Sequence, residues 1–484
     1  MPHSNGPLMD TGSERSKTST KANNNKTRID GMKKINKGKS LSRFQLVSTL
    51  SVLGAMGLAG NVHAAEAFAA DSPWMTGDWN GKRTELLDKG YDFSLEYVSE
   101  MASNLKGGSN DDTTGRYSDQ FALGMKVDLQ KVLGWQDAEF KLAITERSGR
   151  NISNDRIGDP RAGTLSSSQE VWGRGQTWRL TQMWVKQKYF DGALDVKAGR
   201  FGPGEDFNSF PCDFQNLSFC GSQVGNYVNT WYNWPISQWA LRVKYNITPE
   251  VYAQVGVYEQ NPSNLETGNG FKLSGSGTKG MILPVELVWT PTVNSLPGEY
   301  RVGYYKSTPN ADDVYEDVNG QPQAATGAAF KSHDSKHGWW VVAQQQLTSH
   351  NGDASRGLSI FANATVHDKE TNFVDNYQQI GLTYKGPFNS RPKDDIGVGI
   401  ARIHVNDDVQ DRVRLANQIS GINDFDNPGY LPVQSTEYNS EIYYGFHVTN
   451  WLTVRPNLQF IKHPGGVDQV DDAIVAGIKI QSKF

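Results

Sequence analysis

The chain has 484 residues, of which 21% are charged, 11% are aromatic and 49 are glycines, and its mean hydropathy is −0.57. Beyond the N-terminal region no run of 18 apolar residues occurs, which argues against a helical membrane protein. A transmembrane β-barrel stays compatible with this composition, because half of each spanning strand is polar and the average hides the pattern.

The N-terminal region predicts export. Residues 1–31 are rich in Ser, Asn and Lys and show no structural pattern, so we interpret them as a disordered upstream extension. Residues 32–66 combine five basic side chains, an apolar stretch from Phe44 to Leu58 and small residues between Ala64 and Ala67, which is the order of a signal peptide. A membrane anchor is the alternative, but the apolar stretch is short and its downstream flank is small and acidic.

Removal of the leader makes the protein acidic. Residues 1–64 carry ten Lys and Arg against three acidic residues, a formal charge of +7, which leaves −11 for the remaining residues. This charge argues against nucleic acid as a partner and weakly against anionic solutes.

Residues 67–90 predict an N-terminal helical segment on the periplasmic side. The short helix covers Asn80 to Lys89, with Leu86 and Leu87 available for packing. The sequence does not decide between two locations for this helix. It could plug the periplasmic opening, or it could pack at the barrel rim.

Residues 91–484 predict an all-β fold, a 16-stranded antiparallel transmembrane β-barrel, because alternation of apolar and polar side chains recurs sixteen times. The clearest segments begin at Tyr91, Phe121, Ala138, Trp239, Val251, Leu283, Leu358 and Ile442. Weaker ones fall near 177–190, 193–200, 298–307, 337–347, 374–385, 394–404 and 451–462, and the last runs from Asp471 to Phe484.

The connections alternate in length along the chain. Those in odd-numbered places are mostly long, at 102–117, 148–176, 201–237, 260–280, 308–336, 405–435 and 463–470, whereas most others are tight turns, although 348–356 and 367–373 fit poorly. Long extracellular loops and short periplasmic turns describe an up-and-down barrel with both termini at the periplasmic side. A soluble all-β lectin is the alternative fold, but it does not explain why long connections lie at one end and short turns at the other.

Along each strand, polar side chains alternate with apolar ones and form the face opposite the apolar face. They predict a water-filled interior, because a barrel of sixteen strands is wide enough to enclose an aqueous channel. The pore-lining candidates are Lys141, Arg242, Lys244, Arg455, Asn457 and Gln459.

The two cysteines, Cys212 and Cys220, predict a disulfide in a loop, since an exported chain reaches an oxidising compartment. A metal site is the alternative, but it would need further ligands nearby. We expect no metal and no cofactor.

The downstream histidines show neither metal-ligand spacing nor a nucleophile motif, which argues against an outer-membrane enzyme.

Two of the long loops carry residues that suit a sugar. Rings stack on the C–H faces of uncharged sugars, while Arg, Glu and Asn bond the hydroxyls. The candidate constriction residues are Arg147, Glu170, Trp172, Asn233 and Trp234. Two alternative interpretations remain open. Either the loops are solvated extracellular segments that lock the barrel mouth and bind no sugar, or Arg147 only pairs with a neighbouring loop carboxylate.

Several motifs resemble the OprB family of carbohydrate-selective porins, over roughly residues 72–484. They are Trp74–Arg83 followed by Leu86–Phe93, Lys197–Phe201, Asp206–Phe207, Thr453–Phe460 and His463–Gly466. The resemblance implies an outer-membrane porin for passive, facilitated diffusion of glucose and related monosaccharides into the periplasm, with no chemistry performed. The alternative is a general diffusion porin or a channel for another small polar solute.

The expected partners follow from this interpretation. They are a monosaccharide, outer-membrane lipid and lipopolysaccharide, and the barrel assembly machinery, which would recognise the C-terminal Phe484. No sequence feature marks a subunit interface, so a monomer and a homotrimer both remain open.

Overall fold

The computed structural model describes residues 65–110 and 112–484. They belong to a compact unit, Leu53–Phe484, whereas the unit Met1–Val52 lies outside the described residues, as do the predicted extension and nearly all of the predicted signal peptide. No helix among the described residues is long and apolar enough to cross a membrane.

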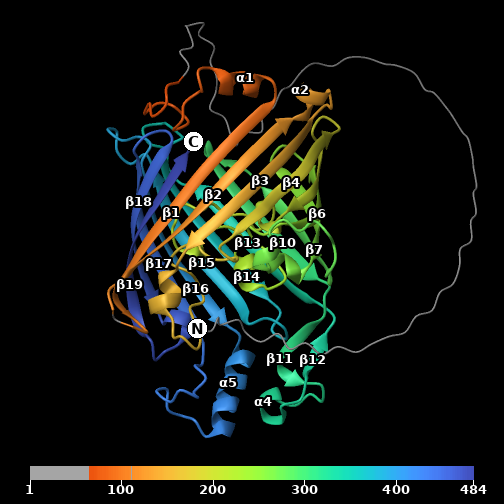
Figure 1. The fold of residues 1–484 in the computed structure, drawn as a ribbon, viewed down its shortest axis with the longest axis vertical. Coiled ribbons are helices and arrows are strands. Elements are labelled where there is room, and N and C mark those ends of the chain that lie inside the picture. The colour runs from red at the N-terminus through yellow and green to blue at the C-terminus, as the bar shows by residue number, and fades with distance from the viewer. Residues whose placement is uncertain (1–64, 111) are drawn as a thin grey trace, which may run out of the picture. The chain divides into compact units, whose positions relative to one another are not determined.

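Sixteen antiparallel strands form a closed barrel, because β1 pairs with both β2 and β19 (Figure 1). The predicted fold class is confirmed, and each predicted segment corresponds to one barrel strand. The strands are β1 (Tyr91–Gly108), β2 (Gly115–Asp128), β3 (Ala138–Gly149), β4 (Trp178–Tyr189), β5 (Leu194–Phe201), β6 (Gln238–Asn246), β7 (Val251–Gln260), β8 (Gly280–Trp289), β10 (Leu296–Ser307), β13 (Lys336–Gln346), β14 (Gly357–His367), β15 (Val374–Lys385), β16 (Asp395–Val405), β17 (Thr436–His447), β18 (Leu452–Lys462) and β19 (Asp471–Lys483).

The strands bury polar side chains and expose apolar ones. In β18, Gln459 is completely buried, while its neighbours Leu458 and Phe460 are 48% and 42% exposed. A soluble protein places these residue types the other way round. The outward face of the barrel therefore requires lipid.

The connections at one end of the barrel carry most of the additional structure. The two-stranded β11 (Ala311–Asp317) and β12 (Phe330–His333), with α4 (Gln323–Thr326), interrupt the loop after β10, and α5 (Asp407–Ser420) follows β16 (Figure 1). The first connection is shorter than predicted, at 109–114 instead of 102–117, because pairing of β1 with β2 continues through Ser103 and Gly115.

At the opposite end lie the tight turns, including α2 (Leu129–Leu133) and the two-residue β9 (Thr292–Val293). Asp128 caps α2, because its carboxylate accepts hydrogen bonds from the backbone N–H groups of Gln130 and Lys131. The remaining helical turns are Ser153–Ile157, Pro203–Glu205, Leu217–Phe219, α3 (Val224–Tyr227), Pro262–Leu265, Thr267–Asn269 and Pro464–Gly466.

The N-terminal helix α1 (Lys82–Asp88) packs at the barrel rim, over the seam between β1 and β19. Arg83 donates from its two Nη atoms to the carbonyl oxygens of Phe484 (2.9 Å) and Phe93 (2.7 Å), and its guanidinium lies 4.1 Å from the ring centre of Trp74. The backbone N–H of Phe484 in turn donates to the carbonyl of Leu95. Helix α1 therefore ties the last residue of the chain to the first strand.

Two connections bend into the barrel and make its core. We name them inner loop A (residues 150–177) and inner loop B (residues 202–237). Loop B buries apolar rings against inward-facing rings of the wall, as in the contacts of Trp231 with Trp340 (5.6 Å between centres) and of Phe214 with Tyr443 (4.8 Å). Ring packing of this kind fixes loop B against the wall.

Candidate functional site: a constriction between the inner loops

Three of the predicted site residues meet beside Gln120, an inward-facing residue of β2. Arg147 donates from Nε to Gln120 Oε1 (2.8 Å), and Trp234 donates from Nε1 to the same oxygen (2.9 Å). Arg147 Nη2 lies 3.9 Å from Glu170 Oε2. Gln120 and Arg147 are cross-strand partners, so β2 and β3 place the cation where loops A and B approach each other.

The other two predicted residues lie in the same loops but outside this contact. Trp172 is half-buried, two residues beyond Glu170, and its backbone N–H donates to the carbonyl of Gln169. Asn233 donates from Nδ2 to the Ser222 carbonyl (2.7 Å) and to Asn226 Oδ1 (3.1 Å), so its donors brace loop B.

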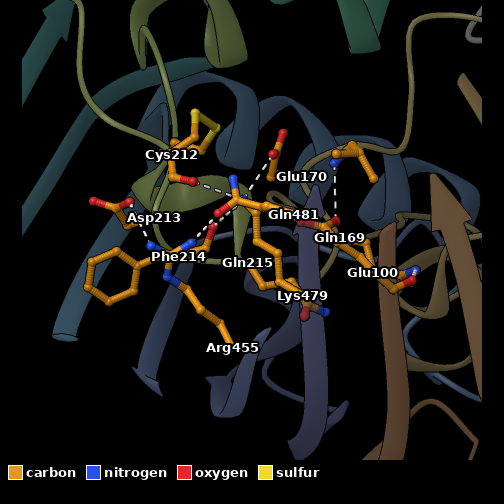
Figure 2. A network of polar contacts seen from close by, with 12 residues as sticks. Glu100, Gln169, Glu170, Cys212, Asp213, Phe214, Gln215, Arg455, Lys479 and Gln481 are labelled. Carbon is orange, nitrogen blue, oxygen red and sulfur yellow. Dashed lines mark hydrogen bonds and ion pairs between the residues drawn. A yellow bond between two sulfur atoms is a disulfide. The ribbon is translucent and has the colours of Figure 1, made fainter. Parts of the chain in front are cut away.

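Beside Glu170, a buried lysine of β19 contacts both loops (Figure 2). Lys479 Nζ donates to Glu170 Oε1 (3.0 Å) and to the backbone carbonyls of Cys212 and Phe214 (2.9 Å each). Glu100 Oε1 of β1 lies 3.6 Å from the same ammonium. The sequence places Lys479 on the inward face of its strand, but no sequence pattern indicates that the loops reach it.

Carboxylates of the wall hold the loop backbones in place. Glu441 accepts hydrogen bonds from the backbone N–H groups of Gln215 (2.9 Å) and Asn216 (2.7 Å), and Glu437 accepts from Leu165 (2.9 Å) and Ser166 (3.0 Å). Hydrogen bonds to an ionised acceptor are stronger than neutral ones. Both glutamates lie on β17, and sequence reasoning missed them because their partners are backbone groups.

Two of the predicted pore-lining residues are covered by the inner loops. Asn457 donates from Nδ2 to Gln215 Oε1 (2.8 Å), and Gln459 donates from Nε2 to the Ser168 carbonyl (3.1 Å). Their side chains point inward as the alternation predicts, but they anchor the loops. They do not line an open passage, because Asn457 and Gln459 are only 9% and 0% exposed.

The four predicted cationic wall residues differ in their partners. Arg242 pairs with Asp195 (2.7 Å) and lies 3.5 Å from Asp206, while Arg455 lies 3.3 Å from Asp213 and 3.4 Å from Asp395.

The two lysines of this set are less constrained. Lys244 Nζ lies 4.8 Å from the ring centre of Tyr252. The half-buried ammonium of Lys141 has no hydrogen bond or ion pair with any residue in the described ranges. Within the described residues, Lys141 is therefore the wall cation of this set with the fewest partners.

Arg174 of loop A is a further cation near Arg147. Its Nη2 donates to the Gly225 carbonyl of loop B (2.7 Å). Burial, together with the neighbouring cations Arg147 and Arg179, lowers the pKa of Arg174 to about 10, so the side chain stays charged at neutral pH.

The cysteines form a disulfide, Cys212–Cys220, within loop B. Glu170 lies next to them, close enough for the three residues to resemble a cluster of metal ligands. Both sulfur atoms are bonded to each other, so neither is available as a thiolate ligand.

Comparison with known proteins identifies the family. The family described as "Carbohydrate-selective porin, OprB family" matches residues 112–484. Porin B of Pseudomonas aeruginosa is 74% identical over 441 residues, which cover 90% of this chain and 97% of that protein. The putative porin QuiX of Acinetobacter baylyi is 44% identical over 430 residues, covering 87% of this chain and 95% of that protein.

Among solved structures, the high-pH structure of OprB from Pseudomonas putida is 78% identical and superposes with a TM-score of 0.86, covering 87% of this chain and 100% of that one. Matches of this extent agree with the closed barrel and with the sequence motifs at both ends of the chain. The chain belongs to the OprB family of carbohydrate-selective porins, which are channels of the bacterial outer membrane.

Proposed function

We propose that this porin allows passive, facilitated diffusion of glucose and related monosaccharides into the periplasm and performs no chemistry. The observation that supports this most directly is the meeting of Arg147, Glu170 and Trp234 between the two inner loops. A cation, a carboxylate and an indole at one place provide hydrogen-bond donors, acceptors and a flat apolar surface, which together match a sugar.

The side chains of Arg147 and Glu170 are only 6% and 11% exposed, so in this proposal a sugar reaches them through the gap between the two groups. Arg147 uses its Nε on Gln120, but its contact with Glu170 is long, at 3.9 Å. A sugar hydroxyl can bridge such a gap, because it both donates and accepts hydrogen bonds. The binding is weak in this proposal, since a site that holds its solute tightly conducts slowly.

We further propose how the chain reaches its place. The predicted signal peptide at 32–66 is removed during export, and the barrel assembly machinery recognises β19 with its terminal Phe484. Lipid and lipopolysaccharide cover the outward apolar face. The position of Phe484 beside Leu95 at the seam supports a role of this strand in closing the barrel.

The sugar proposal is tested by R147A, E170A and the double variant in proteoliposomes. The readout is the swelling rate with glucose divided by the rate with glutamine, a small polar solute that is not a sugar. We expect this ratio to fall about fivefold in the double variant, as for the loss of a hydrogen bond worth roughly 1 kcal/mol.

The matched control is R150A, because this arginine is 68% exposed and lies three residues beyond Arg147. It should leave the ratio unchanged. An unchanged ratio in the double variant would exclude Arg147 and Glu170 as sugar-binding residues.

A further inference from the structure

Lys479 joins the two inner loops through a single buried ammonium group. Its three N–H donors are directed at Glu170 of loop A and at the Cys212 and Phe214 carbonyls of loop B (Figure 2). Its side chain is completely buried. A buried cation must be compensated by charge and by hydrogen bonds, and here the compensating groups come from both loops and from Glu100 of the wall.

The two oxygens of Glu170 are held unequally. Oε1 receives the Lys479 hydrogen bond at 3.0 Å, whereas Oε2 lies 3.9 Å from Arg147. The backbone N–H of Glu170 also donates to the carbonyl of Gln215 in loop B. The orientation of this carboxylate is therefore fixed from behind, by Lys479 and by loop B, and not by the arginine on its other side.

The same ammonium also holds residues 212–214 of loop B. The carbonyls of Cys212 and Phe214 flank Asp213, whose side chain is 40% exposed and lies 3.3 Å from Arg455. Lys479 thus holds one face of this short segment while Asp213 is presented on the other. The disulfide to Cys220 links this segment to the rest of the loop.

We infer that Lys479 is a positioning residue that locks the inner loops together and thereby sets the width of the constriction and the place of Glu170 for sugar binding. This inference deepens the proposed sugar function and rests on it. An arginine is a poor substitute, because a planar guanidinium presents its donors in a fixed fork and not toward three acceptors around one nitrogen.

The test compares K479M with the unsubstituted porin in planar bilayers. Methionine is unbranched, is one heavy atom shorter than lysine and carries no charge. We expect the apparent affinity for glucose, measured from the sugar-induced decrease in current, to fall about tenfold, because a displaced carboxylate no longer meets the sugar hydroxyls. We also expect larger fluctuations of the open-channel current, since loops A and B then move independently.

Two further variants make the result decisive. K462M makes the same change on the outward side of β18 and should behave like the unsubstituted porin. In K479M, the carboxylates of Glu100 and Glu170 lose the cation that faces them. K479M/E100Q neutralises one of these carboxylates, so it allows the test even if K479M does not assemble. Heat-modifiable migration on a gel verifies that each barrel is folded.

A third readout does not depend on sugar binding. The rate at which an added reductant cleaves Cys212–Cys220 should rise in K479M and in K479M/E100Q, because loop B is released. If the unsubstituted porin shows no glucose-dependent decrease in current, the proposed function fails, while reductant access and current fluctuations still test the locking role. Normal glucose affinity, quiet current and unchanged reductant access in the folded double variant would overturn the inference.

Discussion

Gln120 and Gln459 both point into the barrel, but they have different surroundings. Gln120 is partly accessible and accepts hydrogen bonds from Arg147 and Trp234, whereas Gln459 is completely buried beneath loop A. The period of two along a strand predicts which way each side chain points. It does not predict what covers that side chain, because the cover is formed by loops distant in sequence. Residue direction was therefore predictable, but the role of Asn457 and Gln459 as loop anchors was not.

Trp234 allows the ring and its hydrogen bond to be tested separately. W234A removes both, and we expect the apparent glucose affinity to fall about tenfold, since ring contacts contribute about 0.5–1.5 kcal/mol and the bond to Gln120 is also lost. W234F keeps a ring and should reduce the affinity less than about threefold. The measurement is the sugar-dependent decrease of single-channel current.

A second tryptophan serves as the control for this pair of variants. Trp239 is 40% exposed on the outward side of β6, and its Nε1 donates to a loop carbonyl. W239A should leave glucose affinity unchanged. If W234A also leaves it unchanged, the ring is not a sugar-stacking surface.

Strands and loops differ in how far their sequence determines them. Each strand repeats the same simple pattern, so all sixteen were predicted, including β19 as the last. Inner loops A and B have no such repeat, because they are held by scattered contacts to Glu437, Glu441 and Lys479. The sequence also left open where the N-terminal helix lies, and the structure places it at the rim.

Arg83 is the residue through which α1 stabilises the seam. R83A removes two charge-assisted hydrogen bonds to backbone carbonyls and a contact with Trp74, and we expect a loss of about 2–4 kcal/mol of barrel stability. The measurement is the temperature at which the folded form disappears on a gel.

Neighbouring Lys82 provides the comparison, because its side chain is 58% exposed and pairs with Glu85 of the same helix. K82A should change the melting temperature little. R83A should also leave the glucose-dependent decrease in current intact, since α1 lies far along the strands from the constriction. Equal stability of R83A and K82A would show that α1 does not hold the seam.

At the scale of the whole molecule, the barrel has an outward apolar wall and an interior into which two loops pack. The exposed apolar wall and the buried polar lining follow from the alternation of the strands, which is why composition and pattern were enough to predict an outer-membrane porin. The motifs at both ends of the chain were enough to indicate its family, which comparison with known proteins confirms. In the proposed function, selectivity depends on how loops A and B meet, and the sequence did not predict that arrangement.

The most direct test of a sugar-binding constriction is the current through the unsubstituted porin in a planar bilayer during titration with glucose. The same titration is made with a disaccharide and with glutamine. A constriction that binds monosaccharides predicts a saturable decrease in current with glucose and a much smaller one with glutamine. Currents that merely follow the conductivity of the solution, equally for all three solutes, would contradict it and indicate a general diffusion pore.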